Sequence, residues 1–272
     1  MKRLTVISAL TAVALLLGAQ SQADSLTRLS DRDDLFGWEA VGRVDITDDG
    51  YCTGSLVASN LVLTAAHCVF DYSGKMREAS DLQFRAGLSD GTAIATRSVG
   101  RFVVADGYAP GVGMTLDNIR TDAALLELTE AIPTAVAGPF VPYESPRPGD
   151  KLSVVSYGQS RDRAPSRQRE CSVLWRHKGL VSFDCDVTFG SSGAPVFTDG
   201  AYRAQIVSLV VGGSKNPDGT TTAYGMHLPP VLDALKRKLR SAAPAAVATT
   251  TEHKRVKVGQ GGTASGAKFA KP

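Results

Sequence analysis

Short apolar segments separated by turn residues fill the middle of the chain. Val, Leu, Ile and aromatic side chains dominate them, and Gly, Pro, Asp or Asn bound most of them. They lie at residues 40–46, 53–66, 82–87, 98–105, 123–128, 151–158, 171–176, 180–185, 194–197 and 204–212. Evenly spaced short strands with turn signals between them predict an all-β fold, either a barrel or a sandwich.

One segment near the end of the chain has a helical period instead. Between Pro229 and Ser241 the apolar residues fall at positions 231, 232, 235 and 239, which share one face of a helix. Proline suits the first turn of a helix, and basic residues favour its last turn. Residues 132–150 are rich in proline and divide the strands into two halves, so we expect a surface linker there.

The first 23 residues differ in character from the rest of the chain. Lys2 and Arg3 precede an apolar run, and small and polar residues follow it up to Ala23. This order predicts a secretory signal peptide cleaved after Ala23, and therefore a secreted or periplasmic protein. An uncleaved anchor is the alternative, although the run is too short to span a bilayer comfortably. We expect residues 24–37 to form an N-terminal extension.

The net charge of +3 arises outside the predicted folded domain. Residues 24–240 carry 23 basic and 26 acidic side chains, whereas residues 241–272 carry five basic and one acidic. This balance argues against nucleic acid as a partner. Residues 241–272 have few core-forming side chains and predict a disordered basic tail, either simply solvated or weakly held to the cell envelope. A second basic segment, at 161–169, predicts a solvated loop, with self-cleavage or nucleic-acid contact as alternatives.

Four cysteines, Cys52, Cys68, Cys171 and Cys185, form one local pair in each half of the chain. An even number in an exported protein favours two disulfides, for which three connectivities exist. No CxxC motif is present, so the pattern does not indicate a zinc or redox site. The sequence implies neither a cofactor nor a metal.

Three polar residues stand out against the apolar segments. His67 follows the run at 61–66, Asp122 precedes the run at 123–128, and Ser192 follows Ser191 between two glycines. Each has a structural explanation when taken alone, as a packing residue, a turn cap or a loop residue. Together they are the base, the orienting acid and the hydroxyl that nucleophilic catalysis requires.

Other candidates for these roles have weaker sequence contexts. Asp117 is an alternative acid, but no apolar strand follows it directly. His177, His227 and His253 match no motif and are expected in loops or in the tail.

The segments "TAAHC", "DAALLEL" and "GSSGAP" resemble the three catalytic segments of the trypsin-like serine proteases, in their chain order. The resemblance covers about residues 38–240, with halves at about 38–135 and 148–240. It implies two packed six-stranded antiparallel β-barrels with the active site between them, followed by a C-terminal helix. It also implies a secreted serine endopeptidase acting on proteins or peptides through an acyl-enzyme. A bridge from Cys52 to Cys68 is typical of the family, and a local Cys171–Cys185 bridge is expected in the second barrel.

The resemblance assigns a role to each matching position. His67 is the general base, Asp122 its orienting acid and Ser192 the nucleophile, with the N–H groups of Gly190 and Ser192 as the oxyanion hole. Three further residues match substrate-binding positions, namely Asp186, Ser208 and Val210. Asp186 corresponds to the floor of the specificity pocket, and Val210 to a glycine at the mouth of that pocket. Ser208 corresponds to a residue that binds substrate backbone and contacts the catalytic aspartate.

Some positions depart from the digestive enzymes of the family. Ser191 replaces the aspartate that pairs with a newly cut N-terminus, and no Ile-Val-Gly-Gly segment precedes residues 38–44. Ala194 replaces a glycine. These departures resemble the bacterial branch related to glutamyl endopeptidases. Cleavage after basic, small apolar or acidic residues stays open, as does the alternative of a catalytically inactive binding protein on the same fold. A non-proteolytic acyl hydrolase is disfavoured, because no G-x-S-x-G elbow follows a parallel strand.

Overall fold

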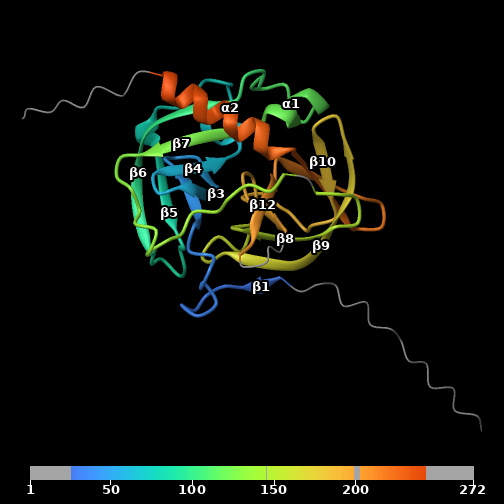
Figure 1. Cartoon of the computed structure of the whole chain (residues 1–272), viewed down its shortest axis with the longest axis horizontal. Helices are drawn as coiled ribbons and strands as arrows, with labels where there is room; N and C mark the ends of the chain where they lie inside the picture. The colour runs from blue at the N-terminus through green and yellow to red at the C-terminus, as the bar shows by residue number, and fades with distance from the viewer. Residues whose placement is uncertain (1–25, 145, 199–202, 243–272) are drawn as a thin grey trace, which may run out of the picture. The chain divides into compact units, whose positions relative to one another are not determined.

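The computed structural model describes residues 26–144, 146–198 and 203–242, and most of their regular secondary structure is β-strand (Figure 1). The predicted signal peptide lies outside the described residues, as do all but the first two residues of the predicted tail. Within the described part of the chain, no helix is long and apolar enough to cross a membrane.

Six strands of the first half close into a barrel. Their order around the barrel is β2 (Val41–Ile46), β3 (Gly50–Ala58), β4 (Leu61–Thr64), β7 (Ala124–Leu128), β6 (Ala95–Val104) and β5 (Leu82–Ala86). The apolar segment at 53–66 is divided between β3 and β4 by a turn at Ser59 and Asn60. Asn is a frequent turn residue because it tolerates the backbone angles of a tight turn.

The second half forms a sheet whose main path runs β12 (Gln205–Leu209), β11 (Pro195–Thr198), β8 (Lys151–Ser156), β9 (Ser166–His177), β10 (Leu180–Phe183), β14 (Thr221–Met226) and β13 (Gly212–Lys215). The short strand β1 (Thr27–Arg28) pairs with β9 beside this path. All pairs in the sheet are antiparallel. The predicted fold class is confirmed, with one closed barrel and a second, half-barrel sheet.

Several elements differ from the sequence prediction. β9 begins at Ser166, so part of the basic segment 161–169 is strand, not loop. The β13–β14 hairpin and the short helix α1 (Leu116–Thr121) were not predicted. Thr, Gly, Ser and Lys dominate the hairpin, so its two strands lack the apolar runs that marked the others.

The predicted C-terminal helix is present as α2 (Leu228–Ser241). Leu232, Leu235 and Leu239, which lie on the face predicted from the helical period, are all buried. Two short 3₁₀ segments, η1 (Ala66–Val69) and η2 (Ala79–Asp81), complete the elements.

An aromatic cluster packs the linker between the two halves. Phe140, from the linker, lies 4.7 Å from the ring of Phe197 in β11, and Trp38 lies 5.1 Å from Phe197. Backbone hydrogen bonds join Phe140 N–H to Leu56 in β3 and Ile206 N–H in β12 to Val141. The linker therefore does more than cross the surface, because its buried Phe140 ties the first barrel to the second sheet.

Candidate active site

His67 lies in η1, directly after the end of β4. The neighbouring Cys68 is bonded to Cys52 in β3, so a disulfide fixes η1 to the adjacent strand. The histidine side chain keeps 35% of its surface exposed, although its neighbours Ala66 and Cys68 are buried. A histidine with a purely structural role would be covered by its neighbours, whereas solvent reaches one side of this ring.

Asp122 holds His67 from the buried side. It caps the C-terminal end of α1, directly ahead of β7, and its side chain is only 7% exposed. Oδ1 accepts a hydrogen bond from the backbone N–H of His67 at 2.9 Å, and Oδ2 lies 2.8 Å from His67 Nδ1. The carboxylate therefore fixes both the backbone and the ring of the histidine.

The electrostatic environment raises the pKa of His67 above its ordinary value. Burial alone would lower this pKa and is the largest single influence. The hydrogen bond to Asp122 and its negative charge together outweigh burial. An imidazole with this partner is a stronger base than a free histidine.

The alternative acid and the other described histidines lie in different surroundings. The Asp117 side chain is 96% exposed and pairs with Arg120 one helical turn away. His227 Nε2 lies 2.6 Å from the carbonyl of Glu144, and His177 ends β9. His253 lies outside the described residues.

Ser191 and Ser192 have different environments in the loop at 188–193. Ser191 is fully buried, and its Oγ lies 3.0 Å from the Oγ of Ser156 in β8. Its backbone N–H donates to Thr188 O at 2.9 Å. Ser192 is partly exposed, and its carbonyl accepts the N–H of Thr53 in β3 at 2.9 Å. The Ser191 hydroxyl is thus engaged inside the protein, which leaves Ser192 as the accessible hydroxyl of the pair.

The backbone of this loop takes an unusual conformation at Gly190. Its φ of +83° lies in the left-handed region, and a Cβ there would clash with the carbonyl of Tyr157 and the ring of Tyr51. Among the described residues, neither Gly190 N–H nor Ser192 N–H donates to another protein group. Two unengaged donors beside an accessible serine are what stabilisation of an oxyanion requires.

The hydroxyl of Ser208 has a different partner from the one that the resemblance implies. Ser208 is buried, and its hydroxyl donates to Met226 O at 2.8 Å rather than to Asp122. Val210 accepts the N–H of Gly193 at 2.8 Å and donates to Ala194 O at 2.9 Å, so it pairs with the serine loop itself. Among the described residues, Ser208 forms no hydrogen bond with Asp122, and its role in binding substrate backbone stays a prediction.

Gly212 and Gly213, which the sequence analysis did not select, follow this pairing. A Cβ at Gly212 would clash with the Met114 side chain, and one at Gly213 would lie 2.9 Å from Val187. Because these two residues have no side chain, Met114, from the loop before α1, and Val187 can approach β13 closely. The two adjacent glycines after the apolar run were the feature of the sequence that could have indicated this close approach.

Asp186 already has protein partners, whereas an acid at the floor of a specificity pocket would be free to pair with the substrate. Its N–H donates to Gln168 Oε1 at 2.7 Å, and one carboxylate oxygen lies 3.6 Å from Lys215 Nζ. The hydroxyl of Thr221 donates to the same oxygen at 3.4 Å. Both charged side chains are more than half exposed. A positive charge therefore already stands beside this carboxylate.

The structure pairs Cys52 with Cys68 and Cys171 with Cys185, the two local bridges expected from the sequence. Cys52, Cys68 and His67 also bring three potential metal ligands within 4.8 Å of one another. Because both sulfur atoms are bonded to each other, they are not thiolates and this group is not a metal site. Disulfides indicate an oxidising, extracellular environment.

The sequence matches the trypsin-like peptidase domain family over residues 52–202. No curated protein matches it. Similar solved structures include a Glu endopeptidase bound to MPD, with 20% identity and a TM-score of 0.65, covering 80% of this chain and 97% of that one. A thermostable serine protease from an extremophilic microorganism has 17% identity and a TM-score of 0.59, covering 75% and 98% of the two chains.

Protease Anisep from Arthrobacter nicotinovorans has 17% identity and a TM-score of 0.61, covering 80% of this chain and 99% of that one. At these identities the structural likeness establishes the fold, and the family match covers more than half of the chain. The chain therefore belongs to the trypsin-like peptidase family, and its enzyme class is that of the serine endopeptidases.

Proposed function

We propose that this protein is a secreted endopeptidase that cleaves peptide bonds through a triad of Ser192, His67 and Asp122. The observation that carries the proposal is the pair of hydrogen bonds that Asp122 accepts from His67, one from the backbone N–H and one from Nδ1. A carboxylate bound to Nδ1 keeps the proton there and leaves Nε2 free to accept another. Asp122 is thus an orienting acid, and His67 is the base.

In the first half of the reaction, Ser192 Oγ attacks the substrate carbonyl carbon while His67 Nε2 takes the hydroxyl proton. The carbonyl oxygen becomes an oxyanion, for which Gly190 N–H and Ser192 N–H are the proposed donors. The C–N bond then breaks, and His67 gives its proton to the leaving amine. The acyl group stays on Ser192 as an ester.

In the second half, water attacks the ester carbonyl and His67 takes a proton from the water. The C–O bond to Ser192 breaks, and the proton returns to Ser192 Oγ. The carboxylic acid product leaves, and the triad regains its starting state. Every proton transfer uses groups of this chain, with Asp122 stabilising the imidazolium between transfers.

Labelling with a fluorophosphonate probe tests this assignment, because such probes react with activated serine nucleophiles. We expect the wild-type protein to be labelled and to hydrolyse peptides, and Ser192→Ala to lose both activities. Ser191→Ala is the matched control and should keep labelling, since its hydroxyl is engaged with Ser156. A wild-type protein with neither labelling nor hydrolysis would favour the alternative of a binding protein on the same fold.

The proposal extends to export and to the domain limits. We propose that residues 1–23 are removed and that residues 38–240 form the protease domain, with residues 241–272 as a basic tail. The two disulfides support an oxidising destination. N-terminal sequencing of protein recovered from the culture medium or periplasm should begin at Asp24. Recovery of full-length protein fixed to the membrane would instead support the uncleaved anchor.

A further inference from the structure

Thr53, a buried residue of β3, contacts the serine loop at two points. Its backbone N–H donates to Ser192 O at 2.9 Å, and its hydroxyl donates to Gly190 O at 2.7 Å. The hydroxyl oxygen also accepts the N–H of Tyr157 at 3.0 Å. Thr53 is fully buried, and its hydroxyl donates one hydrogen bond and accepts another.

The Thr53 hydroxyl holds the peptide group between Gly190 and Ser191, which lies between the two peptide groups that carry the proposed oxyanion donors. In a trans peptide the C=O and the N–H point in opposite directions, so holding one sets the direction of the other. Phe189 O accepts the N–H of Gln159 at 2.7 Å, which turns Gly190 N–H to the opposite side. On the following peptide, Gly190 O is held by Thr53. The peptide groups before and after Gly190 are therefore both anchored by their carbonyl oxygens.

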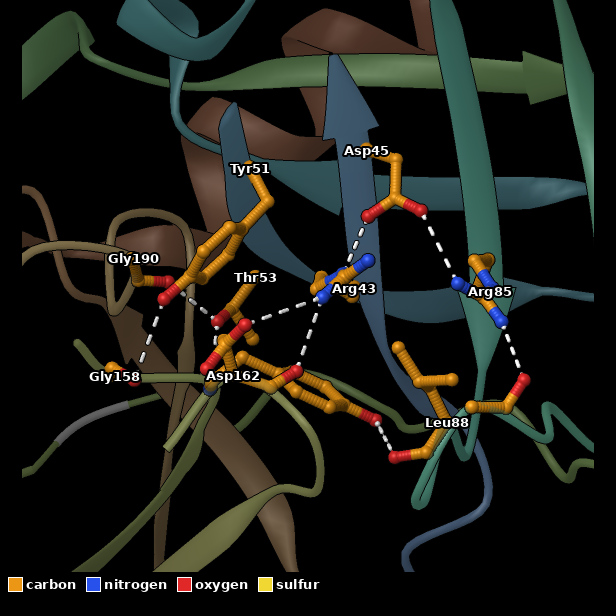
Figure 2. A network of polar contacts seen from close by, with 11 residues as sticks. Arg43, Asp45, Tyr51, Thr53, Arg85, Leu88, Gly158, Asp162 and Gly190 are labelled. Carbon is orange, nitrogen blue, oxygen red and sulfur yellow. Dashed lines mark hydrogen bonds and ion pairs between the residues drawn. The ribbon is translucent and has the colours of Figure 1, made fainter. Parts of the chain in front are cut away.

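The loop that holds Phe189 is in turn tied to the first barrel (Figure 2). The Tyr51 hydroxyl donates to Gly158 O at 3.4 Å, and Arg43 Nη1 donates to Asp162 O at 3.1 Å. The Arg43 guanidinium also lies 5.2 Å from the centre of the Tyr51 ring, a cation–π contact. Both anchors of Gly190 thus trace back to β2 and β3.

No carboxylate stands at position 191 to hold this loop through an ion pair. Ser191 instead contacts Ser156 within the second sheet. The bonds that hold the loop at 188–193 directly are neutral hydrogen bonds, of which the Thr53 hydroxyl contributes the one from a side chain to Gly190 O.

We propose that Thr53 is a positioning residue, whose hydroxyl holds Gly190 O and so keeps the oxyanion hole formed before substrate binds. The inference rests on the proposed function, because it concerns the rate of the same reaction. Thr53 acts through Gly190 and does not touch the substrate. Its contribution should appear in kcat rather than in KM, since the oxyanion exists only in the transition state and the tetrahedral intermediate.

Thr53→Ser and Thr53→Ala form the matched pair for the test. Both remove the same methyl group, but only serine keeps the hydroxyl. Direct removal of an oxyanion donor lowers kcat by about 10² to 10³ fold, so loss of its support should cost less. We expect Thr53→Ala to lower kcat by about 10 to 100 fold with KM nearly unchanged, and Thr53→Ser to restore most of the rate.

Ser55→Ala is the control for loss of a buried hydroxyl on the same strand. Ser55 lies two residues further along β3, is fully buried, and its Oγ has no partner among the described residues. We expect this variant to keep wild-type kcat. If Thr53→Ala does not fold, as judged by circular dichroism, Thr53→Val keeps the side-chain shape without the hydroxyl and should show the same loss.

A pair of inhibitors separates positioning from general damage to the cleft. A peptide aldehyde forms a tetrahedral adduct whose oxyanion lies in the oxyanion hole, whereas the matching peptide alcohol has no carbonyl and forms no adduct. We expect Thr53→Ala to weaken the binding of the aldehyde in parallel with kcat and to leave the binding of the alcohol unchanged. Equal weakening of both, or an unchanged kcat in an active protein, would overturn the role of Thr53. A wild-type enzyme without hydrolysis or labelling would instead contradict the proposed function.

Discussion

Asp122 binds His67 at two points, with Oδ1 on the backbone N–H and Oδ2 on the ring nitrogen Nδ1. The two bonds join different elements, because Asp122 ends α1 and His67 lies in η1. The distance between the residues in sequence is 55 positions, and the barrel pairing of β4 with β7 brings them together. The pairing of strands in the first barrel therefore brings together the acid and the base of the proposed triad.

Replacing Asp122 with asparagine should test that relationship most directly. Asn keeps the shape but offers an amide, which favours the wrong tautomer of His67 and cannot stabilise the imidazolium. We expect kcat to fall by about 10⁴ fold with KM changed little, which is the effect of this replacement in a Ser-His-Asp triad. Asp117→Asn serves as the control, since its exposed side chain pairs only with Arg120. Equal losses in the two variants would contradict the role of Asp122.

The pH dependence of kcat/KM should report the raised pKa of His67. The base acts only when neutral, so activity should rise with pH through that pKa, with its midpoint above the ordinary histidine value of about 6.5. Asp122→Asn removes the negative charge that raises the pKa, so the midpoint should move to lower pH. A midpoint that stays fixed or moves to higher pH in this variant would show that a group other than His67 controls the rise of activity with pH.

The sequence predicted the parts of the fold whose side chains alternate or repeat clearly. The strands of the first barrel and α2 carry such patterns, and the order His67, Asp122, Ser192 could be read from three short segments. The β13–β14 hairpin and α1 lack apolar runs, because Thr, Gly and Ser fill one and only six residues form the other. Strand preference depends strongly on packing against neighbouring strands, so the polar hairpin could not be recognised from its own residues.

The register of β12 could not be read from its sequence either. The apolar run at 204–212 suits several alignments with the serine loop, and the assignment of Ser208 and Val210 depended on choosing one. In the structure the pairing of β11 with β12 shifts register between Val196 and Phe197. Such an irregularity arises from packing between strands distant in sequence, so no local pattern marks it.

The disulfide beside His67 should contribute to both stability and activity. Its loop of 16 residues corresponds to about 3 kcal/mol in the chain-entropy account of disulfide stabilisation. Replacing Cys52 and Cys68 together with serine should lower the free energy of unfolding, measured in urea, by about that amount. Because Cys68 neighbours His67, kcat should fall as well.

The same double replacement at Cys171 and Cys185 is the comparison. Its loop of 14 residues predicts a similar loss of stability. This bridge adjoins Asp186 rather than His67, so it should alter the preference between substrates more than the rate on the best one. If only the replacement of Cys171 and Cys185 affects kcat, the Cys52–Cys68 bridge does not support His67.

The preference at the residue before the cleaved bond should depend on Lys215. Its ammonium lies 3.6 Å from Asp186, in an ion pair that solvent reaches on both sides. We therefore expect the wild-type enzyme to cleave fastest after small apolar residues such as Ala or Val. We expect Asp186 to disfavour an acidic substrate and Lys215 to weaken the attraction of Asp186 for a basic one.

Lys215→Ser should therefore raise cleavage after Arg relative to Ala in otherwise identical peptides. Exposed ion pairs are worth up to about 1 kcal/mol, so the expected change in the ratio is about five fold. The gain should vanish in Lys215→Ser with Asp186→Ser, because the carboxylate that attracts Arg is then absent. Lys238→Ser is the matched control, since Lys238 pairs with Asp106 on another surface. A gain that survives loss of Asp186, or a ratio unchanged by Lys215→Ser, would show that Asp186 does not face the substrate side chain.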